Sequence, residues 1–132
     1  MVLQLKIIGA LLSLLAFLHV GFPKYFKWKE EMKSLSLINK QMMIVHTFFI
    51  ALVVLLIGLL CLTSANELID TRFGKKISLG LGIFWSIRFF FQLFVYSPKL
   101  WKGKKFETIM HILFTLFWIY MSIIFIINYL DK

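Results

Sequence analysis

The sequence of 132 residues contains a single cysteine, Cys61, and therefore cannot form an intrachain disulfide. It has no CxxC pair and no Cys/His spacing typical of a zinc site. It also lacks a glycine-rich phosphate loop and the HExxH and GxSxG motifs. These absences argue against an autonomous hydrolase or ATPase, so we do not expect an enzyme. Cys61 lies in an apolar stretch, where a lone thiol is usually inert filling.

Acidic residues are also scarce, with 6 Asp and Glu against 15 Lys and Arg. None of the acidic residues lies well inside a long apolar stretch, which disfavours a pump driven by carboxylate protonation. The net charge of +9 comes from lysines placed beside the ends of the apolar stretches. An anionic lipid surface is therefore the expected partner of these lysines, rather than nucleic acid.

Hydrophobic residues make up 61% of the chain, which is too much for a soluble domain of this size to bury. They fall into four blocks, at about residues 3–22, 44–63, 77–96 and 108–130. Each block approaches the roughly 20 residues that a helix needs to cross a bilayer. The blocks do not alternate as the strands of a barrel would. We predict one all-α domain, 1–132, a four-helix transmembrane bundle with short loops.

The first block resembles a secretory signal in having a positive charge, Lys6, before an apolar stretch. A signal peptide ends in small residues at a cleavage site. Here Phe17, His19 and Phe22 occupy the critical places instead. We therefore expect a retained first helix.

Positive charge is unevenly distributed between the two sides of the predicted bundle. The first and third loops carry nine Lys residues and the opposite side carries five Lys or Arg, which favours cytoplasmic first and third loops. Both termini of this multi-pass protein of the cell membrane would then face outward. The first set is Lys24, Lys27, Lys29, Lys33, Lys40, Lys99, Lys102, Lys104 and Lys105, and the second is Lys6, Arg72, Lys75, Lys76 and Lys132.

The first loop has its own pattern. Trp28, Met32, Leu35 and Met42 recur at helical spacing among charged residues, which predicts a short amphipathic helix in the headgroup layer. Aromatic residues on the same side suit an interfacial belt. They are Tyr25, Phe26, Tyr96, Trp101 and Phe106. The connection between the second and third spans is expected to be short.

Four histidine or arginine residues lie within the predicted spans: His19, His46, Arg88 and His111. An arginine at the centre of a span costs roughly 2.5–3.5 kcal/mol on insertion scales, so it needs a compensating interaction. His19 is near the end of the first span, while His46 and His111 are near the starts of the second and fourth. In an up-and-down bundle all three histidines therefore fall in the same half of the membrane.

Polar residues form one stripe on each of the last two spans, and we expect the stripes to face each other. Glu107 is the nearest available counter-charge for Arg88 or for a protonated His111. The stripes are Trp85, Arg88, Gln92 and Tyr96 on the third span, and Glu107, His111, Thr115, Trp118 and Ser122 on the fourth.

Several chemistries fit these residues. Two neutral histidines can ligate a haem iron, and His with Arg can hydrogen-bond quinone carbonyls or a lipid phosphate. His19, His46 and His111 are also candidate metal ligands, with Glu107 as a fourth. Proton relay is a further use of intramembrane histidine. The structural alternative is that the histidines reach headgroup water and that Arg88 snorkels.

Small residues mark a packing surface. Ser78, Gly82 and Ser86 repeat every four residues on the third span, and Gly9 and Ser13 offer a shorter version on the first. Such stripes let a neighbouring helix approach closely, either inside the bundle or in another subunit, including a second copy of the chain.

Residues Ile38 to His46, followed by Arg88 to Tyr96 and Trp101 to His111, resemble a group of small four-span bacterial membrane proteins. The resemblance covers most of the chain and implies a four-span fold in a bacterial membrane. That group supplies no assigned activity.

The leading functional hypothesis is an intramembrane His/Arg pocket for a haem-like redox cofactor or a quinone-like or anionic ligand. His46 and His111 are the favoured ligands, His19 is an additional one, and Arg88 with Gln92 would orient the bound group. The alternative is a non-catalytic accessory subunit that stabilises a larger membrane complex. Transport comes third, since four helices make a narrow pore only as an oligomer.

Overall fold

The computed structural model describes residues 1–131, and four of its helical segments are long and apolar enough to cross a membrane. The first segment joins α1 (Val2–Leu18), the 3-10 turn η1 (His19–Gly21) and α2 (Phe22–Tyr25). The other three are α4 (Leu37–Thr63), α6 (Arg72–Phe94) and α7 (Lys105–Leu130). The all-α prediction with four spans is confirmed.

The contacts divide the chain into two compact units. The N-terminal unit comprises Leu3–Ala65, and the C-terminal unit comprises Met1–Val2 and the residues from Asn66 onward. The prediction of one domain over 1–132 stays a prediction.

Two of the helices begin earlier than their apolar blocks because polar caps extend them. The Ser36 hydroxyl accepts a hydrogen bond from the Asn39 N–H, so α4 starts at Leu37 rather than near residue 44. Thr71 accepts from the Gly74 N–H at 2.8 Å, and α6 starts at Arg72 rather than near residue 77. Both additions mix polar and apolar residues, so the apolar blocks do not include them.

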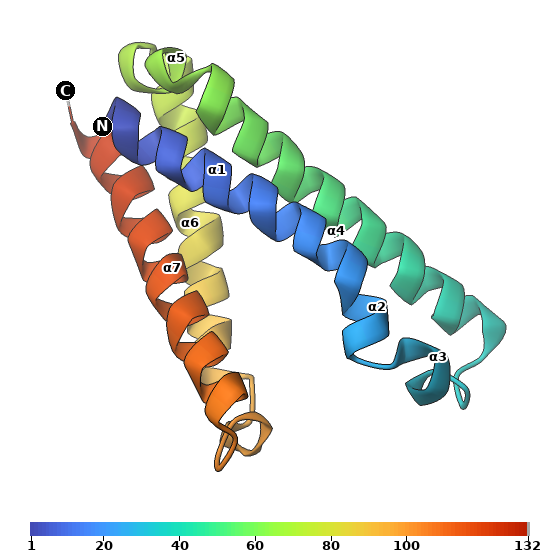
Figure 1. Cartoon of the computed structure of the whole chain (residues 1–132). Coiled ribbons are helices and arrows are strands. Elements are labelled where there is room, and N and C mark those ends of the chain that lie inside the picture. The colour runs from blue at the N-terminus through green and yellow to red at the C-terminus, as the bar shows by residue number, and fades with distance from the viewer. Residues whose placement is uncertain (132) are drawn as a thin grey trace. The chain divides into compact units, whose positions relative to one another are not determined.

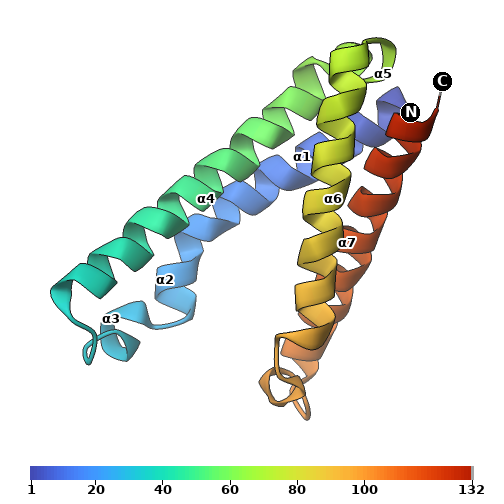
Figure 2. The ribbon, with the colours of Figure 1, turned by 180° about the vertical axis from the view of Figure 1, so that it is seen from behind.

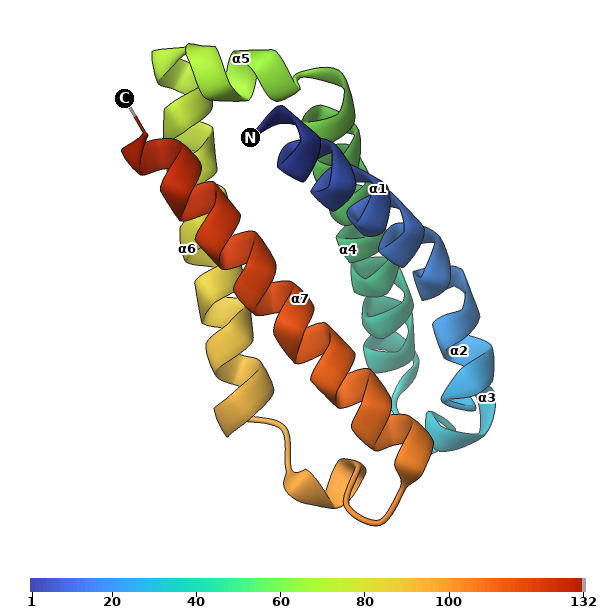
Figure 3. The same cartoon turned by 60° about the vertical axis from the view of Figure 1, so that its left-hand side comes forward.

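The connecting segments differ from expectation. The amphipathic helix predicted over residues 28–42 is not continuous: the single turn α3 (Trp28–Glu31) follows Lys27, whose φ of 53° is left-handed, and α4 begins anew at Leu37. The connection before α6 contains a short helix, α5 (Ala65–Asp70), that the sequence analysis missed. Figure 3 shows α5 lying across the start of α6. The 3-10 turn η2 (Pro98–Leu100) begins the last connection.

In the N-terminal unit, α1 and α4 run side by side (Figure 1) and approach closely through glycine. A Cβ placed on Gly58 would lie 2.7 Å from the Ser13 Oγ and 2.9 Å from the Gly9 carbonyl oxygen. A Cβ on Gly9 would lie 2.6 Å from the Gly58 carbonyl oxygen. The backbones of the two helices therefore touch where neither residue has a side chain.

In the C-terminal unit, α6 and α7 also run side by side (Figure 2), but side chains join them. The buried Asn128 donates from Nδ2 to the Ser78 Oγ at 2.6 Å and to the Leu68 carbonyl oxygen at 3.0 Å. Gly82 faces Ile126. Lys75 donates to the carbonyl oxygens of Asn128 and Asp131, which caps the end of α7 with a cation.

Candidate functional site

The polar stripes of α6 and α7 meet inside the C-terminal unit. Arg88 and Gln92 are one turn apart on α6, and His111 lies in the second turn of α7. Arg88 precedes the end of α6 at Phe94 by six residues, and His111 follows the start of α7 at Lys105 by six. At 1.5 Å per residue, both side chains start about 9 Å inside their helix ends.

A directed chain of hydrogen bonds joins the three side chains. The Arg88 Nη1 donates to the Gln92 Oε1 at 3.2 Å, and the Gln92 Nε2 lies 3.0 Å from the His111 Nδ1. A guanidinium only donates, so the amide atom facing it must be the oxygen. The amide nitrogen then donates to the His111 Nδ1. Neutral His111 therefore carries its proton on Nε2.

Aromatic rings flank the half-buried Arg88 and stabilise its charge. The guanidinium Cζ lies 5.0 Å from the ring centroid of Trp118 and 5.4 Å from that of Tyr96. Arg88 is half-buried, and a cation–π contact short of full desolvation contributes about 1 kcal/mol, so the two contacts offset part of the insertion cost of arginine. Trp85 stacks on Trp118 with centroids 5.0 Å apart and planes 5° apart. The stripe of Arg88 thus faces α7 rather than lipid.

Trp101 covers the imidazole of His111. The two ring centroids are 3.7 Å apart and the planes differ by 14°. The Thr108 hydroxyl lies 2.7 Å from the Trp101 carbonyl oxygen, and this contact ties the connection back to α7. Trp101 was predicted to belong to an interfacial belt, because nothing in its spacing showed that the connection folds back over the helix.

Unpartnered polar groups in this cluster are donors. Over residues 1–131, the indole Nε1 atoms of Trp85 and Trp118 are buried without a hydrogen-bond partner. The Nε2–H of His111 is a donor by the assignment above. We call Arg88, Gln92, His111, Trp101 and Trp118 the α6–α7 cluster. Its chemistry suits a group that accepts hydrogen bonds.

The other two histidines lie in the N-terminal unit and have the opposite tautomer. The Nδ1 of His19 lies 2.8 Å from the Leu15 carbonyl oxygen, and that of His46 lies 2.7 Å from the Met42 carbonyl oxygen. A carbonyl only accepts, so each Nδ1 carries the proton. In the neutral form each Nε2 is then a bare acceptor.

The structure thus brings Arg88, Gln92 and His111 together, while His19 and His46 belong to the other unit. Convergence of the three histidines on one ligand stays a prediction. Glu107 lies in the first turn of α7, one turn before His111. Over residues 1–131, neither unit contains a group of three or more His, Cys, Asp or Glu side chains arranged to hold a metal ion.

Comparisons of the chain with protein-family models, curated proteins and solved structures find no match. The resemblance to small four-span bacterial membrane proteins stays a prediction.

Proposed function

We propose that the protein is a small integral membrane protein whose α6–α7 cluster binds a headgroup that accepts hydrogen bonds. A quinone carbonyl and the phosphate of an anionic lipid share this chemistry. The ligand would lie between the two helices, about 9 Å inside their ends, where Arg88 and His111 can both donate to it.

The order of the hydrogen bonds from Arg88 through Gln92 to His111 carries this proposal. It leaves the free nitrogen of the imidazole protonated, and a protonated ring nitrogen donates to an oxygen but has no lone pair for iron. The same order therefore favours the quinone-like or anionic ligand over the haem-like one. Of the five N–H groups of Arg88, one is used by Gln92.

The accessory-subunit alternative loses part of its basis. Ser78 and Gly82, two members of the small-residue stripe that suggested it, contact Asn128 and Ile126 inside the C-terminal unit. These two residues thus serve the packing of α6 against α7. A role in a larger complex stays a prediction, and we assign no surface to the binding of a partner.

The test compares His111→Phe with His46→Phe in detergent-purified protein. The first substitution keeps a ring for Trp101 to stack on and removes both nitrogens, while the second changes an exposed histidine of the other unit. Solvent extraction with chromatography would measure bound quinone, and native mass spectrometry would measure retained anionic lipid. We expect His111→Phe to reduce the retained ligand about tenfold, as loss of a strong hydrogen bond predicts, and His46→Phe to leave it unchanged.

Three results would overturn the proposal. Wild-type protein that retains neither quinone nor anionic lipid has no such ligand. Equal retention by His111→Phe would show that the imidazole does not contact it. A Soret band in the wild type that disappears in both variants would instead establish the haem hypothesis with His46 and His111 as ligands.

A further inference from the structure

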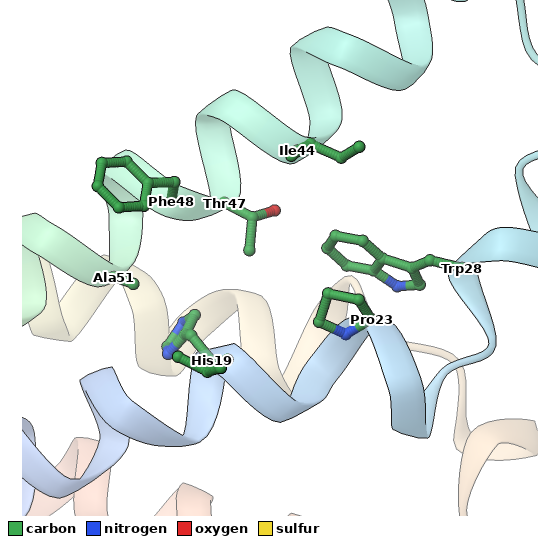
Figure 4. Close-up of a pocket in the computed structure, with 8 residues that line it drawn as sticks. His19, Pro23, Trp28, Ile44, Thr47, Phe48 and Ala51 are labelled. Atoms are coloured by element: carbon green, nitrogen blue, oxygen red, sulfur yellow. The ribbon is translucent and has the colours of Figure 1, made fainter.

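The N-terminal unit contains a cavity that shares no residue with the α6–α7 cluster. It has a volume of about 180 Å³, and Figure 4 shows most of the side chains around it. Its walls come from η1 and α2, from α3, and from the first half of α4. The lining residues are His19, Val20, Pro23, Trp28, Ile44, Thr47, Phe48 and Ala51. None of them is an acid, a lysine or an arginine, so the cavity suits a neutral, mainly apolar group.

The cavity is open on one side, and its volume indicates how large a ring its walls can contact. A dry apolar cavity of about 150 Å³ is enough to bind benzene. This cavity, at about 180 Å³, therefore accommodates one six-membered ring with one or two small substituents.

The polar atoms at the cavity define the substituent. His19 offers a bare Nε2, because its Nδ1–H is bonded to the Leu15 carbonyl. The Thr47 hydroxyl donates its proton to the Met43 carbonyl oxygen at 2.8 Å, so towards a ligand it can only accept. The indole N–H of Trp28 is the one remaining side-chain donor among the lining residues. A hydroxyl group, which donates once and accepts, complements this set.

We propose that the cavity binds an aromatic alcohol, a phenol or the ring of a hydroquinone. The ring packs between Pro23 and Phe48, and its hydroxyl donates to the His19 Nε2. A carbonyl compound such as a quinone would leave this nitrogen without a donor, which distinguishes the ligand chemistry of the cavity from that of the α6–α7 cluster. The proposal does not depend on that cluster, because every residue it uses belongs to the N-terminal unit.

The test uses p-cresol and toluene as probes, since the two differ only by a hydroxyl group. Binding to the full-length protein in nanodiscs would be measured by ligand-observed NMR, and the ratio of the two dissociation constants is the readout. His19→Leu removes the acceptor. His46→Leu is the matched control, because His46 makes the same bond to its own helix but does not line the cavity. Any partitioning of the probes into lipid is equal in the two variants.

We expect wild-type protein and His46→Leu to prefer p-cresol about fivefold, and His19→Leu to lose this preference. Ala51→Phe, which fills the cavity, should abolish saturable binding of both probes. Equal binding of toluene and p-cresol by the wild type would show an apolar groove suited to lipid chains, and an unchanged preference in His19→Leu would place the hydroxyl elsewhere. Either result overturns the proposal.

Side-chain ¹⁵N NMR of the wild type gives a second measurement that needs no variant. The Nε2 resonance of His19 should start in the range of an unprotonated nitrogen and shift on addition of p-cresol but not of toluene. A resonance that p-cresol leaves unchanged would also overturn the proposal, even if His19→Leu failed to fold.

Discussion

The two helical pairs of this protein are held together in different ways. In the N-terminal unit, α1 and α4 touch backbone to backbone at Gly9 and Gly58. In the C-terminal unit, α6 and α7 are joined by side chains, with Asn128 at one end and the Arg88–Gln92–His111 chain at the other. Lipid provides no hydrophobic driving force for helix association, so each pair needs close packing or hydrogen bonds. The N-terminal unit relies mainly on close packing, and the C-terminal unit relies on both close packing and hydrogen bonds.

The histidines follow the same division. The Nδ1–H groups of His19 and His46 each donate to the carbonyl oxygen four residues earlier in the chain, so neither bond joins one helix to another. The Nδ1 of His111 accepts across the helix pair, from Gln92. One unit therefore exposes imidazole acceptors and the other an imidazole donor, which is why we assign them ligands of opposite hydrogen-bonding character.

The largest effect should come from adding a side chain at the backbone contact. Gly58→Leu would place a Cβ within 3 Å of Ser13 and Gly9, and we expect it to destabilise the N-terminal unit by about 3 kcal/mol. Thermal unfolding in detergent, followed by size-exclusion chromatography, would measure the loss. Gly80→Leu is the control, because nothing lies within 4 Å of a Cβ at Gly80. Equal destabilisation by the two substitutions would contradict the close approach of α1 and α4.

A smaller loss of stability is expected from Asn128→Leu, which removes hydrogen bonds at one end of the α6–α7 pair. Asn128→Leu keeps the volume but removes the bonds to Ser78 and Leu68, and we expect a loss of about 1–2 kcal/mol, since interhelical hydrogen bonds in membranes are modest. The free energy of unfolding in mixed micelles would measure it. Ser122→Ala is the control, because the Ser122 hydroxyl donates to the Trp118 carbonyl oxygen of its own helix rather than to α6. A variant as stable as wild type would mean that packing alone joins α6 and α7.

The smallest effect on stability, about 1 kcal/mol, should come from Gln92→Glu, but it would give the sharpest spectroscopic change. A carboxylate beside Arg88 accepts from the guanidinium and cannot donate to His111. The His111 proton should therefore move from Nε2 to Nδ1, which ¹⁵N NMR of the imidazole would detect. Thr115→Val, which alters only a bond to the His111 backbone, should leave the tautomer unchanged. A proton already on Nδ1 in the wild type would refute the assigned hydrogen-bond order.

The spans could be read from the sequence because each apolar block is near the length that crosses a bilayer. Their starts could not, because the caps at Ser36 and Thr71 add polar turns outside the blocks. The alignment of the Arg88 and His111 stripes follows from helical spacing. By contrast, Gly58 was missed because a single glycine makes no stripe on its own helix, and its role appears only opposite Gly9.

The conformations of two residues in the connecting segments also could not be predicted from the sequence. Trp101 has the composition of a belt residue, and only the fold of the last connection places it on His111. Lys27 separates α2 from α3 with a left-handed backbone that side-chain periodicity does not predict.

Three of the four tryptophans lie in the C-terminal unit and give it an optical label. Trp118 lies under a guanidinium and Trp101 lies on an imidazole, so two of the four tryptophans of the chain border the proposed ligand site. Indole emission responds to a nearby charge and to a stacked ring. Occupation of the site, or a change of its protonation, should therefore be visible as intrinsic fluorescence, without a dye or a tag.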